Sequence, residues 1–184
     1  MRYFDASALA KRYVREKGSA TVRRLLASGV AATSRLSEVE VASAIARRAR
    51  EGAMSVDQRD RLLAALGEDV PALAIVELVP VVVADARSLL SRQVLRAADS
   101  VQLASALYLQ REVARPVEFV VFDERLARAA RAEGLTVVGV PRRASQPTAA
   151  RAPRPVERAG MDDAPVPGGR VPGRAARRRR ARRR

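Results

Sequence analysis

Four carboxylates lie in apolar surroundings where ordinary surface charges are uncommon. Asp5 and Asp123 each come directly after apolar residues of a strand-like segment, in YFDASALA and FVVFDERL. Asp99 lies on the apolar face of a predicted helix, and Glu40 has apolar residues one helical turn away on either side. Because an ionised carboxylate is costly to bury unless it is paired or binds a metal, the pattern suggests that these four acids converge on a divalent cation.

The composition of the chain narrows the chemistry that such a site could perform. The 184 residues include no cysteine and no histidine. Thiolate zinc sites, iron–sulfur clusters, cysteine nucleophiles, histidine-ligated metals and Ser-His-Asp catalysis are therefore excluded. A metal bound by this protein would have oxygen ligands, which Mg²⁺ and Mn²⁺ prefer.

Each acid also has a simpler structural interpretation. Asp5 and Asp123 are both placed to cap a following helix. Glu40 could be the capping-box partner of a serine at position 37, and Glu38 competes with it for the functional role. Asp99 could pair with a nearby arginine such as the one at position 96. The spacing alone leaves the choice between these interpretations and a metal site open.

Short strand-like runs alternate with helical segments along the first 140 residues. The pattern predicts strands at 2–5, 30–34, 72–79, 118–123 and 135–140, and helices at 7–16, 19–28, 37–50, 55–67, 84–93, 97–113 and 124–133. Such alternation is typical of an α/β domain with a central parallel sheet covered by helices on both faces. Ligands of such sheets bind outside the carboxyl ends of the strands, where Asp5 and Asp123 are expected.

The positive charge of the chain is concentrated at its C-terminal end. Residues 141–184 carry 14 arginines against three acidic residues, and seven of the ten prolines, whereas residues 1–140 carry 21 basic and 17 acidic residues. This composition predicts a folded domain over 1–140 and a disordered Pro/Arg-rich tail over 141–184. Because the sequence has no apolar run of membrane-spanning length and no signal-peptide pattern, we expect a cytoplasmic protein without a membrane segment.

Four blocks of the sequence resemble, in order, the motifs of PIN-domain ribonucleases, above all the VapC-type toxins of type II toxin–antitoxin pairs. The blocks are YFDASALAKRYVREKGS, SRLSEVEVASAIARR, LRAADSVQLASAL and FVVFDERLARAARAEGLTVV, and they span nearly all of residues 1–140. The resemblance implies a three-layer α/β/α domain with a central parallel sheet. It also implies Mg²⁺- or Mn²⁺-dependent hydrolysis of RNA, a homodimer, and inhibition by a VapB-like antitoxin.

The resemblance also implies roles for individual residues. The family's acids fall on Asp5, Glu40, Asp99 and Asp123, and the hydroxyl that follows the first acid falls on Ser7. Asp5 and Asp99 would be the principal metal ligands, while Glu40 and Asp123 would complete the shell directly or through water. One of these last two could accept the proton of the attacking water. Ser7 would form a hydrogen bond with a carboxylate or a water molecule.

Two positions depart from the family pattern without removing a carboxylate. Many relatives have histidine where this chain has Gln102, and threonine or serine where it has Val121. These departures and the arginine-rich tail keep a second hypothesis open, a weakly catalytic or inactive nucleic-acid-binding regulatory protein on a PIN-like scaffold. Arginines near the cleft, such as Arg12 or Arg47, are candidates for contacts with RNA phosphates.

Overall fold

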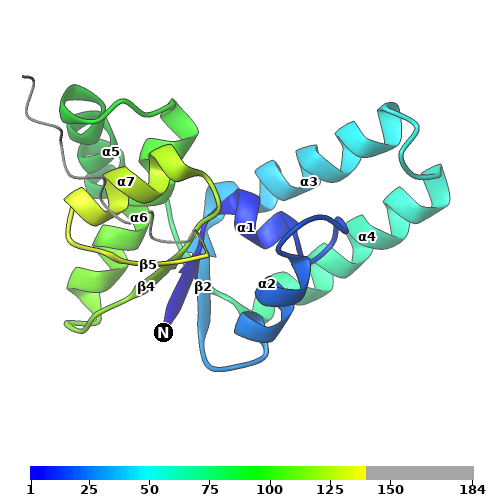
Figure 1. Ribbon diagram of the computed structural model, residues 1–184, viewed down its shortest axis with the longest axis horizontal. Helices are drawn as coiled ribbons and strands as arrows, with labels where there is room; N and C mark the ends of the chain where they lie inside the picture. Colours follow the sequence, from blue (N-terminus) through cyan, green and yellow to red (C-terminus); the bar gives the residue numbers. More distant parts are fainter. Residues whose placement is uncertain (140–184) are drawn as a thin grey trace, which may run out of the picture. The chain divides into compact units, whose positions relative to one another are not determined.

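The computed structural model describes residues 1–139, in which five short strands form one parallel sheet (Figure 1). The strand order is β3-β2-β1-β4-β5, so the first strand lies at the centre. The strands are β1 (Arg2–Phe4), β2 (Ala31–Ser34), β3 (Ala74–Val76), β4 (Glu118–Val120) and β5 (Thr136–Val138). The helices are α1 (Ala6–Ala10), α2 (Ser19–Leu26), α3 (Arg35–Arg50), α4 (Val56–Asp69), the short 3₁₀ helix η1 (Val70–Ala72), α5 (Pro80–Arg92), α6 (Ala97–Glu112) and α7 (Glu124–Ala132).

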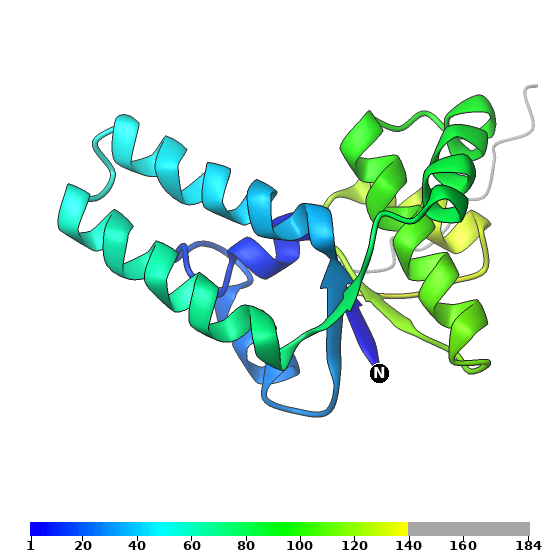
Figure 2. The same ribbon diagram turned by 180° about the vertical axis from the view of Figure 1, so that it is seen from behind.

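Two layers of helices cover opposite faces of this sheet. Successive residues of β1 point to opposite sides, as in any strand: Tyr3 packs in the core beneath α5, α6 and α7, and Phe4 packs in the core beneath α1 to α4. The same two groups of helices lie on either side of the strands in both views (Figures 1 and 2). The predicted three-layer α/β/α arrangement with a central parallel sheet is therefore confirmed.

Helix α3 begins earlier than the sequence predicts. Its N-cap is Ser34, the last residue of β2, whose hydroxyl accepts a hydrogen bond from the Leu36 N–H at 3.2 Å. The predicted cap, Ser37, is instead buried inside the first turn. Both serines precede a helical apolar pattern, but Ser34 lets the strand pass into the helix without a loop. Figure 2 shows α3 and α4 lying side by side beyond the sheet.

Two other predicted elements also have different bounds. Helix α1 ends at Ala10 rather than at position 16, because the next N–H groups, from Lys11 to Tyr13, bond to carbonyls three residues back and form tight turns. Helix α5 begins at Pro80, four residues before the predicted start, since proline suits the first helical position. The strand before α5 is correspondingly short.

The loop after α1 packs tightly against the segment that follows β4. Gly18 has a φ of +95°, and a Cβ atom at this position would lie only 2.7 Å from Cε1 of Phe122. The ammonium group of Lys11 lies 4.9 Å from the centroid of the same ring. Phe122 is therefore held from two sides, which fixes the end of the strand segment immediately before Asp123.

Two further expectations concern the C-terminal tail and the absence of a membrane-spanning segment. The predicted disordered tail at 141–184 lies outside the described residues. Within residues 1–139, no helix combines the length and the apolar character that crossing a membrane requires.

Candidate active site

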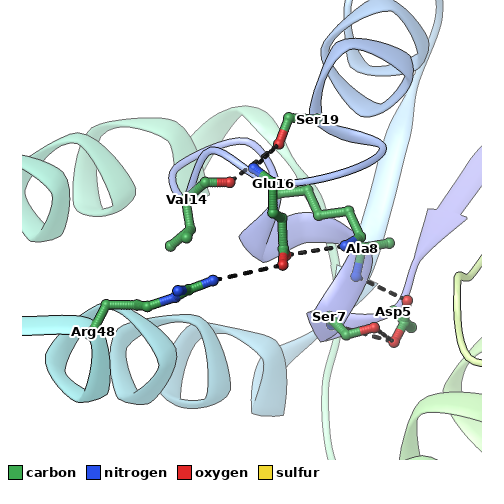
Figure 3. A network of polar contacts seen from close by, with 8 residues as sticks. Asp5, Ser7, Ala8, Val14, Glu16, Ser19 and Arg48 are labelled. Carbon is green, nitrogen blue, oxygen red and sulfur yellow. Dashed lines mark hydrogen bonds and ion pairs between the residues drawn. The ribbon is translucent and has the colours of Figure 1, made fainter. Parts of the chain in front are cut away.

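Asp5 lies at the carboxyl end of the central strand and is almost completely buried, with 4% of its surface exposed. Its Oδ1 accepts the Ala8 N–H at 3.0 Å, and its Oδ2 accepts the Ser7 hydroxyl at 2.7 Å and the Ser7 N–H at 3.2 Å (Figure 3). The capping interpretation of Asp5 is thus confirmed. Burial nevertheless raises the pKa of Asp5 to about 6, with a further contribution from the negative charge of Glu40. Asp5 is therefore a helix cap whose pKa is raised by its burial.

Glu40 projects from α3 and is half-buried. Its Oε2 accepts a hydrogen bond from the Gln102 side-chain amide at 2.7 Å. Burial raises the pKa of Glu40, and the neighbouring charge of Asp99 raises it further. Glu40 cannot act in a capping box with position 37, because α3 begins before that residue. Glu38, the competing acid, instead forms an ion pair with Arg35 at 3.1 Å.

Asp99 lies in the first turn of α6 and pairs with an arginine distant in sequence. Its Oδ2 is 2.9 Å from Nη2 of Arg125, in the first turn of α7. The residue suggested by the sequence, Arg96, contacts Asp99 through its backbone N–H at 3.4 Å. Sequence reasoning missed Arg125, although there was a signal for it. A cation in the first turn of a helix is unfavourable beside the positive end of the helix dipole, which calls for a nearby anion.

Asp123 lies at the end of the strand segment after β4, as predicted, and its carboxylate caps helix α7. Its Oδ1 accepts the Leu126 N–H at 2.8 Å, and the residue is exposed. The capping interpretation is confirmed here as well.

Three of the four acids affect one another through their negative charges. The charge of Glu40 raises the pKa of Asp5, and the charge of Asp99 raises the pKa of Glu40. The atoms that these acids offer to a metal are all carboxylate oxygens. A hard divalent cation would relieve the repulsion between the three negative charges. Each is currently held by a protein donor, and within residues 1–139 no three acidic, histidine or cysteine side chains lie close enough to hold a metal ion. Carboxylate oxygens suit Mg²⁺ or Mn²⁺, and the convergence of all four acids on one cation stays a prediction.

A cleft of about 540 Å³ extends along α3, and Glu40 is the one of these three acids that lines it. Ser7 and Glu40 line it together with three arginines, Arg47, Arg48 and Arg96. Arg48 lies 3.9 Å from a carboxylate oxygen of Glu16, as Figure 3 shows, so this ion pair is a loose one. The lining of the cleft therefore includes three arginines and two acids, Glu16 and Glu40.

Arg12, the other arginine suggested by the sequence, lies outside this cleft. Its guanidinium makes a two-point ion pair with Asp69, at 2.5 and 2.8 Å. Of the two candidates, the structure therefore brings only Arg47 to the cleft that Glu40 lines.

The raised pKa of Asp5 predicts a specific dependence of stability on pH. The folded protein binds the Asp5 proton more tightly than the unfolded chain, whose carboxyl group has a pKa near 3.8. Stability should be greatest below this value, fall as the pH rises through about 6, and stay lower above it. The loss over the whole range should be about 3 kcal/mol, from about 1.4 kcal/mol for each pH unit between the two pKa values, and about 2 kcal/mol of it should fall between pH 4 and pH 7.

Asp5→Asn should remove this component, because an amide caps the helix without titrating. Urea unfolding of both proteins should be measured from pH 4 to pH 7. The free energy of unfolding of the wild type should fall by about 2 kcal/mol relative to that of Asp5→Asn over this range. A stability difference that is the same at every pH would contradict the assigned pKa shift.

Comparisons with known proteins identify the family. The solved structure of FitAcB from Neisseria gonorrhoeae is similar, with a TM-score of 0.56 and 16% sequence identity over 74% of this chain and 96% of that one. At this level of identity the similarity concerns the fold alone. A search of curated proteins found no significant match. The PIN domain family matches residues 2–132, which include all four acids, and the chain therefore belongs to the PIN domain family.

Proposed function

We propose that this protein is a divalent-metal-dependent ribonuclease resembling VapC toxins. The observation that carries the proposal is the interaction of Asp5 with Glu40 and of Glu40 with Asp99, together with a cleft that Glu40 lines with three arginines. PIN domains are generally nucleases that use divalent metal ions. Hydrolysis of a phosphodiester needs an activated water and neutralisation of the phosphate charge, and a carboxylate-bound Mg²⁺ or Mn²⁺ supplies both.

The site residues divide this work according to their environments. Asp5 and Asp99 would be the principal holders of the cation, with Glu40 beside them and Asp123 acting through water. Glu40 is best suited to accept a proton, because its pKa is raised and its Oε1 makes no hydrogen bond within residues 1–139. The Ser7 hydroxyl donates to Asp5 Oδ2, which keeps that carboxylate oriented.

The three arginines that line the cleft favour a nucleic acid as the substrate. Arg47, Arg48 and Arg96 lie along one cleft with Glu40, where they can contact successive phosphates of a single strand. Arginine contacts to phosphate position a strand without specifying its sequence. A weakly catalytic RNA-binding regulator would use the same arginines, so the two functions differ in whether the carboxylates support cleavage.

A cleavage assay separates these two functions. Pooled RNA with Mn²⁺ should be cut by the wild type, EDTA should stop cleavage, and added Mn²⁺ should restore it. Asp99→Asn should lower the cleavage rate by about 100-fold or more, since it removes a metal-binding charge. The matched control is Asp60→Asn on α4, where an exposed carboxylate pairs with the neighbouring Arg59 at 2.7 Å. Cleavage by a folded Asp99→Asn protein at the wild-type rate, or cleavage that persists in EDTA, would favour the binding protein.

We also propose a homodimer that is inhibited by a VapB-like antitoxin. A second cleft, of about 430 Å³, lies between α1, α2 and η1, and the half-buried side chains of Leu26 and Leu73 line it. Light scattering at micromolar concentration should give the mass of a dimer. Co-expression with a small protein encoded next to this one should yield a stable complex that does not cut RNA. A monomer with no such neighbour would count against this part of the proposal.

The basic segment 141–184 is proposed as an arm outside a ribonuclease domain of residues 1–140. A dense arginine run favours polyanions, so it should raise the affinity for RNA without choosing the sequence. Truncation after Val140 should preserve metal-dependent cleavage and its site preference. It should flatten the salt dependence of RNA binding by about 0.7 in log–log slope for each phosphate of a single strand that the arm neutralises. An unchanged slope would leave this segment without a role in binding.

A further inference from the structure

A buried amide lies directly behind Glu40. Gln102 on α6 is only 2% exposed, yet every hydrogen-bonding group of its side chain has a partner. Its Oε1 accepts the Tyr3 hydroxyl at 2.8 Å. Its Nε2 donates to Glu40 Oε2 at 2.7 Å and to the Ser37 hydroxyl oxygen at 3.0 Å. The amide thus joins the central strand, α3 and α6 at one point behind the acids.

The surrounding hydroxyls fix the orientation of this amide. Thr33 donates its only hydroxyl proton to the Phe4 carbonyl, at 2.8 Å. The Thr33 and Ser37 hydroxyl oxygens are 2.6 Å apart, so Ser37 must be the donor of that pair. Ser37 is then free to accept an N–H from Gln102. A flipped amide would instead place its carbonyl oxygen against the Glu40 carboxylate, which is repulsive.

The tyrosine end of the network is equally well defined. Complete burial raises the pKa of Tyr3, so its hydroxyl keeps its proton and remains a donor to Gln102. At the other end, the network terminates on the carbonyl of Phe4, the residue immediately before Asp5. The same hydrogen bonds therefore tie the position of Glu40 to the strand that carries Asp5.

Glu40 needs such a tether because its neighbours repel it. Asp5 and Asp99 both interact unfavourably with its charge, and Glu40 borders an open cleft into which its side chain could turn. The bond from Gln102 holds one carboxylate oxygen, while Oε1 makes no hydrogen bond within the described part of the chain. One edge of the carboxylate is fixed and the other is left for a ligand.

We propose that Gln102 is a positioning residue that holds Glu40 beside Asp5 and Asp99 for divalent-cation binding. This inference rests on the proposed function and adds to it how one member of the metal site is oriented. A purely structural Gln102 would stabilise the fold without affecting the affinity for a cation. The two roles are separable by measuring cation affinity and stability on the same variants.

The test uses Mn²⁺ titration calorimetry on the full chain without added RNA. Gln102→Met keeps the length of the side chain and removes its donors, and should weaken Mn²⁺ binding by about 10- to 100-fold, as is usual for partners of metal ligands. The control is Gln110→Met on the same helix, where the amide oxygen accepts the Val117 N–H at 3.1 Å. That variant should lose stability while its Mn²⁺ affinity stays within about twofold of the wild type.

Tyr3→Phe supplies a second variant, which still tests the proposal if Gln102→Met does not fold. Loss of the hydroxyl removes the donor to Gln102 Oε1 and loosens the amide behind Glu40, so Mn²⁺ binding should weaken. The double variant should match Gln102→Met alone, because Tyr3 acts through the amide. Wild-type Mn²⁺ affinity in folded Gln102→Met, or in Tyr3→Phe when Gln102→Met does not fold, would overturn the positioning role and leave the ribonuclease proposal standing. A wild-type protein that binds no Mn²⁺ would overturn both.

Discussion

The buried carboxylate of Asp5 constrains this end of the molecule more than any other group. It sits at the end of the central strand, where burial opposes its charge, and it is tolerated because Ser7 and the Ala8 N–H donate to it. Those donors exist only if the chain turns into α1 immediately after the strand. The abrupt turn after β1 and the start of α1 are therefore linked to the hydrogen bonding of one buried acidic side chain.

The three coupled acids are stabilised by three different chemical means. Asp5 relies on N–H and O–H donors and on a raised pKa, Glu40 on a neutral amide, and Asp99 on the full positive charge of Arg125. These three partners hold like charges near one another, one at the end of β1 and two on the helices α3 and α6, an arrangement that costs stability. Because the partners differ, a cation that binds these acids would have to replace a different hydrogen-bond or ion-pair partner at each carboxylate.

The sequence predicts the parts of this site that depend on local pattern. Strand-end acids are visible because apolar runs stop at Asp5 and Asp123, and the alternation of strands and helices fixes which end of the sheet they share. The ion pair of Asp99 with Arg125 spans 26 residues and depends on how two helices approach one another. No periodicity encodes that distance. The sequence predicts a later start of α3 than the structure shows for a local reason, since two serines three residues apart both suit an N-cap.

The glutamine that departs from the family pattern is explained by the groups around it. A neutral imidazole has one N–H donor and one acceptor nitrogen. It could not donate to both Glu40 and Ser37 while also accepting from Tyr3, whereas the Gln102 amide does all three. The hydroxyl chain behind it requires such a residue, because Ser37 has already committed its proton. Gln102 therefore holds Glu40 with a set of hydrogen bonds that a histidine could not form in full.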